Sequence, residues 1–73
     1  MRIKVKPVGI IRRFADEQEM EAEGGTTSQD LISLLRIPAE LKMIAIVNGK
    51  GRDLNAELLD GDAVTLVTLL TGG

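Results

Sequence analysis

The chain has 73 residues, 44% of them hydrophobic, which is enough for one small domain with a single core. Nine basic and eleven acidic residues give a net charge of −2, and this balance, with a single aromatic residue, argues against a nucleic-acid-binding protein. Cysteine and histidine are absent, which excludes disulfides, thiolate or imidazole metal sites, and catalytic nucleophiles that rely on either residue. The apolar runs are too short to cross a bilayer and no signal peptide opens the chain, so we expect a cytoplasmic protein without a membrane partner.

Two paired strands are predicted at the start of the chain, over residues 2–7 and 17–23. Ile3 and Val5 alternate with basic residues in the first strand, and Met20 and Ala22 alternate with glutamates in the second. Pairing the strands as a hairpin matches opposite charges on the outer face, where Arg2, Lys4 and Lys6 meet Glu19, Glu21 and Glu23. The sequence leaves the turn between them open, either near residues 7–9 or near residues 15–16.

A helix is predicted between the glycine pair at 24–25 and Pro38. Thr27 is a suitable N-cap, and Asp30 lies in the first turn, where its charge suits the helix dipole. Pro38 stops the helix because the residue before a proline avoids helical dihedral angles. We expect the buried face to comprise Leu31, Leu34 and Leu35, with Ile32 beside them.

The second half of the chain contains at least two further strands. Residues 43–47 precede Asn48-Gly49, a strong hairpin signal, and residues 63–70 form the most strand-like segment of the chain. Residues 51–59 are irregular, with room for one short strand. Asp60 and Asp62 flank a glycine in a tight turn, so we interpret them as turn residues and not as a catalytic or metal-binding pair. The fold class is therefore α+β, with one main helix packed on a mixed sheet of four to five strands.

The last strand presents a candidate binding surface. If Val64 and Leu66 face the core, then Val67 and Leu69 face outward with Thr65 and form a small apolar patch of the kind that contacts another protein. Patterning alone leaves open whether another part of the chain covers this patch. Two arginines without an obvious acidic partner, Arg12 and Arg13, are further candidates for partner contact.

The sequence ends in Thr71-Gly72-Gly73, which we interpret as a flexible tail after a domain of residues 1–70. Glycine has no side chain, so a Gly-Gly end is thin enough to enter a narrow active site. From Leu70 to the end, the chain reaches at most about 13 Å beyond the fold. The α-carboxylate of Gly73 could then be activated as an acyl-adenylate by another enzyme. Simple fraying of the terminus is the competing interpretation.

The complete pattern resembles the ubiquitin-like sulfur carriers of the β-grasp fold, a family that includes the small subunit of molybdopterin synthase and the thiamine-biosynthesis sulfur carrier. The resemblance covers essentially the whole chain. It is carried by the opening strand, by TTSQDLISLL at 26–35, by IVNG at 46–49, by LLDGDAVTL at 58–66 and by the closing TGG.

The resemblance implies a mechanism and a set of partners. An E1-like adenylyltransferase would use ATP to adenylate Gly73, a sulfur donor enzyme would convert it to a thiocarboxylate, and an acceptor synthase subunit would take the sulfur. The chain would be a carrier and not an enzyme, with no bound cofactor, and the absence of cysteine fits sulfur held at the terminal carbonyl. Gly72 and Gly73 match the double glycine of the family, and the activating enzyme would contact Val67, Leu69 and Leu70.

The sequence defines the pathway that receives the sulfur less clearly. The stretch before Asp60-Gly61-Asp62 resembles the molybdopterin-type carriers, whereas thiamine-type carriers more often place an arginine and an aromatic residue there. Carriers of the molybdopterin branch usually have prolines and a phenylalanine just before the tail. The segment LVTLL has neither, so a tungsten-pterin route or another sulfur-transfer route stays open. We favour the pterin branch, with the thiamine-thiazole pathway as the alternative. A ubiquitin-like protein modifier and a plain β-grasp interaction domain are alternatives of another class.

Overall fold

A computed structural model describes residues 1–69 of the chain. Its elements in chain order are β1 (Arg2–Pro7), the 3-10 helix η1 (Gly9–Arg13), β2 (Gln18–Glu21), α1 (Ser28–Leu34), β3 (Met43–Val47), β4 (Lys50–Arg52) and β5 (Ala63–Thr68). Neither helix in this part of the chain is long and apolar enough to span a membrane.

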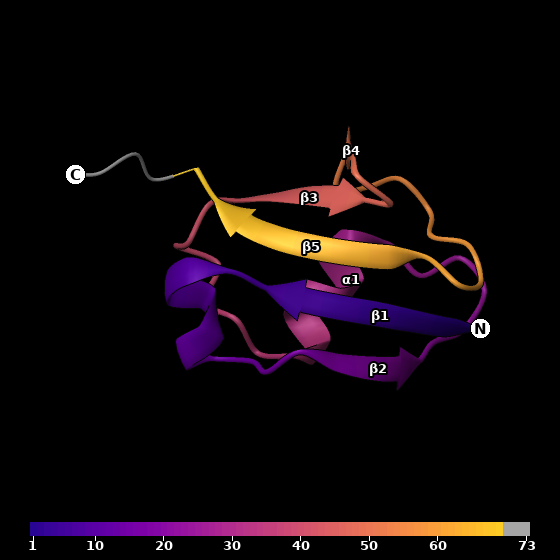
Figure 1. Cartoon of the computed structure of the whole chain (residues 1–73), viewed down its shortest axis with the longest axis horizontal. Helices are drawn as coiled ribbons and strands as arrows, with labels where there is room; N and C mark the ends of the chain where they lie inside the picture. The colour runs from indigo at the N-terminus through magenta and orange to yellow at the C-terminus, as the bar shows by residue number, and fades with distance from the viewer. Residues whose placement is uncertain (70–73) are drawn as a thin grey trace.

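The five strands form one mixed sheet in the order β2-β1-β5-β3-β4. β1 and β5 run parallel at the centre, and β1–β2, β3–β4 and β3–β5 are antiparallel pairs. α1 packs on one face of the sheet (Figure 1). We call the other face the open face. This arrangement confirms the predicted α+β class with one main helix on a mixed sheet.

The first hairpin has the predicted register, with Arg2 opposite Glu21 and Lys4 opposite Glu19. Arg2 Nε lies 3.2 Å from Glu21 Oε1, but neither Lys4 nor Lys6 forms a salt bridge with a carboxylate in residues 1–69. The expected neutralisation of the basic row by glutamates is therefore only partial. The connection between the strands is longer than a turn, because η1 lies between them and buries Ile11 completely.

Both ends of α1 are capped, as the local sequence requires. Thr27 and Asp30 form a capping box: the Asp30 amide donates to Thr27 Oγ1 at 3.1 Å, and the Thr27 amide donates to Asp30 Oδ2 at 2.9 Å. At the other end the amide of Ile37 donates to the Ile32 carbonyl and that of Arg36 to the Ser33 carbonyl, which is a Schellman motif. Arg36 has a φ of 57°, so the helix ends before Pro38 can stop it.

The predicted buried face of α1 is partly wrong. Leu31 and Ile32 are buried and Leu35 is half-buried, but the Leu34 side chain is 63% exposed. Ser28 takes the corresponding inner position at the start of the helix and is buried. The inner stripe therefore runs along residues 28, 31, 32 and 35, which is the normal spacing of one helix face.

The hairpin between β3 and β4 has the predicted turn. Asn48 and Gly49 have φ values of 51° and 85°, and Val47 pairs with Lys50, so the loop has two residues with positive φ, as in a type I′ turn. β4 is the short strand for which the irregular segment left room. The core between α1 and the sheet is almost wholly aliphatic and includes Ile3, Val5, Ile11, Leu31, Ile32, Ile37, Ala45, Val47, Leu58, Val64 and Leu66.

Candidate functional site

The start of β5 is fixed by a buried carboxylate. Asp62 is only 8% exposed, and its oxygens accept hydrogen bonds at 2.8 Å from the Asn48 side-chain amide and from the Leu59 backbone amide. Asn48 Oδ1 in turn accepts from the Ala63 amide at 2.9 Å. Asp60 accepts from the Arg2 amide at 2.7 Å. Both aspartates thus stabilise the loop that leads into β5, which confirms that they are turn residues.

The two faces of β5 are those predicted from the sequence. Val64 and Leu66 are buried, whereas Thr65 and Val67 are half-buried and Leu69 is 53% exposed. The Leu69 amide donates to the Lys42 carbonyl at 2.8 Å, so the pairing toward β3 continues one residue past the end of the strand. Val67 and Leu69 are therefore presented outward from a firmly paired segment.

Two residues that the sequence analysis missed extend this surface on the open face. Ile44 of β3 pairs with Val67 across the antiparallel ladder. On the other side, Pro7 pairs with Leu66 and the Val8 amide donates to the Leu66 carbonyl at 3.0 Å, which places Val8 beside Val67. Val67 of β5 thus lies between Ile44 of β3 and Val8, the residue that follows β1. We call these three residues, together with Leu69, the apolar row.

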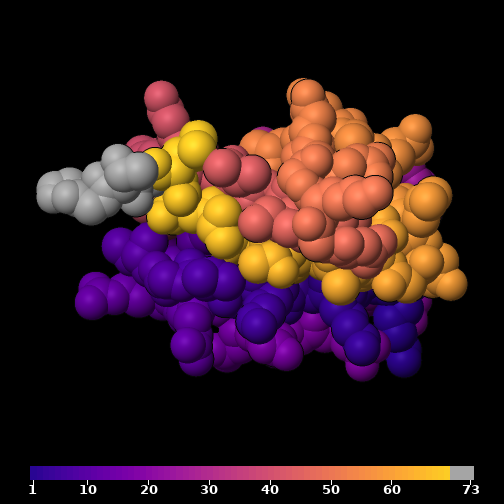
Figure 2. Space-filling model, turned by 45° about the horizontal axis from the view of Figure 1, so that its top comes forward, coloured from indigo at the N-terminus to yellow at the C-terminus, as the bar shows by residue number. Residues whose placement is uncertain are grey.

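The apolar row lies on one continuous surface. In Figure 2 the yellow atoms of β5 lie between indigo atoms of the N-terminal segment and rose atoms around β3, in agreement with the strand order. No local signal distinguished Ile44, because residues 43–47 are all apolar; its outward position follows from the burial of its neighbours Met43 and Ala45. The position of Val8 could not be inferred without knowing that β1 pairs with β5.

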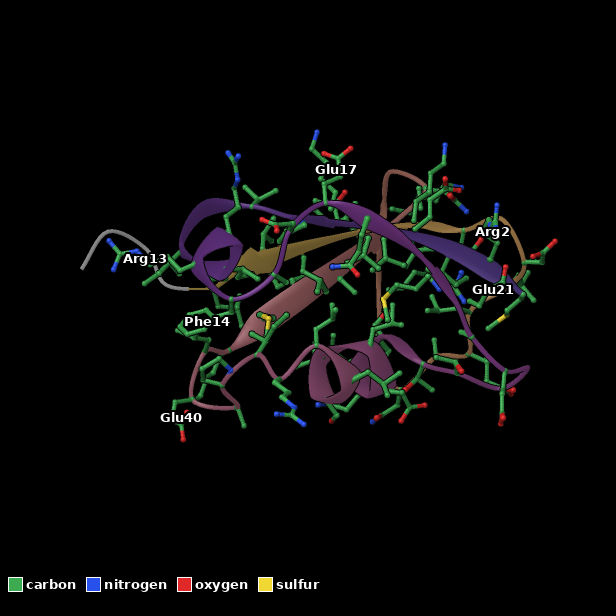
Figure 3. All side chains as sticks on the ribbon, turned by 90° about the horizontal axis from the view of Figure 1, so that it is seen from below. Arg2, Arg13, Phe14, Glu17, Glu21 and Glu40 are labelled. Atoms are coloured by element: carbon green, nitrogen blue, oxygen red, sulfur yellow. The ribbon has the colours of Figure 1, made fainter. Side chains whose placement is uncertain are left out.

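The two candidate arginines lie at the same end of the molecule as the apolar row. Arg12 and Arg13 occupy the last turn of η1, which follows the end of β1, and both are exposed. Figure 3 shows Arg13 and Phe14 at the end where β5 terminates, and the Arg2–Glu21 pair at the opposite end. Arg12 also lines a hollow of about 360 Å³, together with Lys6, Pro7, Val8, Gly9, Asp16 and Glu17.

Four residues of the predicted site lie outside the described part of the chain: Leu70, Thr71, Gly72 and Gly73. The structure does not test the roles that the sequence suggests for them, and it does not test the proposed boundary between the domain and its tail.

Three solved structures resemble the whole chain in fold. SAMP1 from Haloferax volcanii gives a TM-score of 0.77 at 15% sequence identity, over 100% of both chains. A putative molybdopterin converting factor subunit 1 from Pyrococcus furiosus gives 0.74 at 25% identity, over 94% of this chain and 98% of the other. Subunit 1 in the complex of subunits 1 and 2 of the molybdopterin-converting factor from Helicobacter pylori gives 0.67 at 24% identity, over 100% of both chains. These similarities place the chain among the small ubiquitin-like β-grasp proteins.

The family follows from the sequence. The model of the ThiS family matches residues 5–73, and the chain therefore belongs to the ThiS family, in line with its resemblance to ubiquitin-like sulfur carriers. A comparison with curated proteins finds no significant match.

Proposed function

We propose that this protein is a sulfur carrier whose Gly73 carboxylate is adenylated by an E1-like enzyme and then converted to a thiocarboxylate. The sulfur is passed to an acceptor synthase subunit. In this scheme the protein is a co-substrate and not an enzyme, and it binds no cofactor of its own, because ATP is held by the activating enzyme. Membership of the ThiS family supports the carrier role.

The observation that carries the proposal is the geometry at the end of β5. This strand is paired on both sides, by β1 and by β3, and its start is fixed by Asp62. Leu69 lies exposed one residue beyond it, and four residues of sequence separate Leu69 from the carboxylate of Gly73. Four residues span at most about 13 Å, so an enzyme that reaches the carboxylate must also approach the apolar row.

The proposed chemistry needs no acid, base or metal from the carrier. A carboxylate oxygen of Gly73 attacks the α-phosphorus of ATP, and pyrophosphate leaves. With sulfide as the sulfur source, sulfur attacks the terminal carbonyl carbon and AMP leaves with one of the original carboxylate oxygens, which gives the thiocarboxylate. The thiocarboxylate sulfur then bonds to the acceptor, and hydrolysis of the resulting thioester breaks the acyl carbon–sulfur bond, which leaves the sulfur on the acceptor and restores the carboxylate. A chain without cysteine has no thiol that could compete for the activated carbonyl.

We propose that the partners dock on the apolar row, with Arg12 and Arg13 at its border and Leu70 and Thr71 leading into the active site. Three of its four side chains, Val8, Ile44 and Leu69, are exposed, and a contiguous apolar surface of this kind is typical of a protein contact. Gly72 and Gly73 would pass through a channel too narrow for side chains.

We favour a molybdopterin-type pathway. The support is the likeness to subunit 1 of molybdopterin converting factors, one of which was solved with its subunit 2, and the acceptor proposed for this chain corresponds to that second subunit. A strain that lacks the gene should lose molybdopterin-dependent enzyme activity and grow without thiamine. A thiamine requirement would indicate the alternative, the thiazole branch.

The function itself is tested by intact-mass spectrometry. The protein is incubated with ATP, Mg²⁺, sulfide and an E1-like adenylating enzyme from the same cells. We expect a mass gain equal to the replacement of one oxygen by sulfur, absent when ATP is omitted. Deletion of Gly73 should abolish the gain, whereas Asp53→Ala, which changes an exposed side chain outside the tail and the apolar row, should preserve it.

Other outcomes identify the competing functions. Higher-mass conjugates on lysine side chains would indicate a ubiquitin-like modifier that uses the same activated carboxylate. If the variant without Gly73 were activated as well as the full chain, the terminal carboxylate would have no role and both functions would be excluded.

A further inference from the structure

β2 is an edge strand, and main-chain groups on its outer side have no partner. β1 is its only neighbour in the sheet. The Ala22 amide donates to the Met1 carbonyl at 2.8 Å, and the Met1 ammonium donates to the Ala22 carbonyl at 2.7 Å. Hydrogen-bonded pairs alternate along an antiparallel ladder, so Met20 also bonds to β1, whereas the amides and carbonyls of Glu19 and Glu21 point away from it. We call this side of β2, with two donors and two acceptors, the free edge.

The hydrogen bonds of β1 support this alternation. The Arg2 amide donates to Asp60 Oδ1 at 2.7 Å, and the Lys4 amide donates to the Asp62 carbonyl at 3.0 Å. Arg2 and Lys4 are the residues opposite the two glutamates, and their amides thus point away from β2. Within residues 1–69, no hydrogen bond ends on the main-chain groups of either glutamate. The free edge is therefore available for pairing.

The side chains of β2 differ between its two faces. Glu19 and Glu21 are exposed on the open face, whereas Met20 and Ala22 are half-buried on the inner face and pack against the core. A strand added at the free edge would continue the same alternation, because side chains of paired residues lie on the same face. Its residues opposite the glutamates would lie beside carboxylates, and those between them would lie on the side of α1.

A hollow of about 490 Å³ lies between β2 and α1, on the inner side of the free edge. It is lined by Glu21, Ala22, Glu23, Thr26, Asp30, Ser33 and Leu34. Among these, Leu34 is the large apolar side chain and is 63% exposed. Figure 3 views the molecule from the side of β2, with α1 below the sheet. An aliphatic side chain in this hollow would cover the leucine that α1 leaves exposed.

We propose that the free edge accepts an extended segment of another protein in which basic residues alternate with aliphatic ones. The segment pairs with the main chain of Glu19 and Glu21, and its basic side chains lie beside their carboxylates. An aliphatic side chain between the basic ones enters the hollow next to Leu34. β1 already has this chemistry on the other side of β2, where Arg2 and Lys4 face the same two glutamates.

Charge favours this occupant over a second copy of the chain. Glu21 pairs with Arg2, but Glu19 and Glu23 form no salt bridge within residues 1–69. A second copy that paired through its own β2 would place glutamates opposite glutamates, which is unfavourable. The other edge strand, β4, has Gly51 between its two basic residues and so offers no aliphatic side chain for the hollow. The occupant is therefore a basic segment of a different protein.

Peptide binding tests the alternation. The probe is a capped five-residue peptide in which three lysines alternate with two valines, and the control is the isomer with both valines at one end. In NMR titrations of the ¹⁵N-labelled protein at low salt, we expect the alternating peptide to bind at least about fivefold tighter than the isomer. It should shift the amide signals of Glu19 and Glu21 and slow their hydrogen exchange.

Three results of the titration would overturn the proposal. The first is equal binding of the isomer, which would show a contact by charge alone. The second is the absence of saturable shift changes at Glu19 and Glu21. The third is concentration-dependent protection of these two amides without peptide, which would make a second copy the occupant.

Two pairs of variants test the free edge and the hollow. Glu19→Pro removes an amide that points away from β1, and proline is tolerated at such an edge position. We expect Glu19→Pro to weaken peptide binding about tenfold or more, and its charge control Glu19→Gln less than about threefold. Leu34→Ala should weaken it about threefold or more. Leu59→Ala, at a residue 70% exposed but outside the hollow, should change it less than about twofold.

Binding to a folded Glu19→Pro variant as tight as to wild type would refute pairing at the free edge. If Glu19→Pro does not fold, the comparison of Leu34→Ala with Leu59→Ala decides, and equal effects of these two variants would refute the proposal.

The free edge is separate from the surface assigned to the proposed function. β1 lies between β2 and β5, so the free edge and the apolar row can be occupied at the same time. Leu34→Ala should therefore gain sulfur in the mass assay as wild type does. A failed peptide titration would leave the carrier function intact, and a failed mass assay would leave the free edge as a binding site.

Discussion

Replacement of the buried carboxylate of Asp62 by alanine should remove much of the stability of the domain. Two hydrogen bonds of 2.8 Å end on this carboxylate, from Asn48 Nδ2 and from the Leu59 amide, and the residue is 8% exposed. A hydrogen bond to a charged group contributes about 1.5–3 kcal/mol. Because the two bonds share one network, their contributions do not simply add, and we expect Asp62→Ala to lower the free energy of unfolding by about 3 kcal/mol. For so small a domain we expect a total free energy of unfolding near the lower end of the usual range of about 5–15 kcal/mol.

Asp62→Asn separates the two bonds. The asparagine oxygen can accept from one donor, but its NH₂ group then faces the other donor. Asn48 cannot compensate by turning its amide, because its Oδ1 already accepts from the Ala63 amide at 2.9 Å. We therefore expect Asp62→Asn to lose roughly half as much free energy of unfolding as Asp62→Ala, about 1.5 kcal/mol.

Urea unfolding followed by far-ultraviolet circular dichroism measures these differences, since the chain has no tryptophan or tyrosine for fluorescence. Asp53→Ala is the matched control, because Asp53 accepts a hydrogen bond at 2.8 Å from the Asn55 amide but is exposed; we expect it to cost less than about 1 kcal/mol. The reasoning is refuted if Asp62→Ala costs no more than Asp53→Ala, or if Asp62→Asn does not fall between wild type and Asp62→Ala.

Four further substitutions test the site, the C-terminal end of α1 and the two faces of α1. Leu69→Asp should weaken binding of the adenylating enzyme by about tenfold while the free energy of unfolding changes by less than about 0.5 kcal/mol; a variant that unfolds would show that Leu69 belongs to the core. Arg36→Gly should raise the free energy of unfolding by about 0.5–1 kcal/mol, because glycine adopts the positive φ of this position without strain. An unchanged midpoint of urea denaturation would contradict this prediction. Ile32→Ala should lower the free energy of unfolding by about 2–4 kcal/mol and Leu34→Ala by less than about 0.5 kcal/mol. A larger loss for Leu34→Ala would show that Leu34 is buried, as first predicted from the sequence.

Local chemistry made several parts of the fold predictable. The alternation around Ile3 and Val5 gives β1, Asn48-Gly49 gives the β3–β4 turn, and Thr27 with Asp30 gives the start of α1. Each of these signals depends on residues within a few positions of one another. The matched charges of β1 and β2 also gave the correct register, although only Arg2 and Glu21 lie close enough to form a salt bridge.

The errors arose where a polar residue occupies an inner position. Ser28 is buried on the inner face of α1, at a position that no hydrophobic side chain marks, and the expected stripe included Leu34 instead. In a helix of only seven residues, one position decides which face is apolar. The 3-10 helix η1 was not predicted, because it buries a single side chain, Ile11, and therefore shows no repeated hydrophobic pattern.

The candidate site could be predicted only in part. The outward positions Val67 and Leu69 follow from alternation within one strand. Val8 and Ile44 join them because β5 lies between β1 and β3, and this order brings together segments from opposite ends of the chain. No pattern within a short window contains that information, so the width of the surface emerges only from the sheet.

The parallel pairing of β1 with β5 has a consequence for how the protein is made. β1 is synthesised before β5 and must wait for it, because β5 fills the space between β1 and β3 and carries Val64 and Leu66 into the core. A nascent chain that stops before residue 63 leaves β1 and β3 without their common neighbour, and its exposed strand edges and apolar side chains make it a substrate for proteases and chaperones. Synthesis must therefore continue through β5 before a stable domain can form.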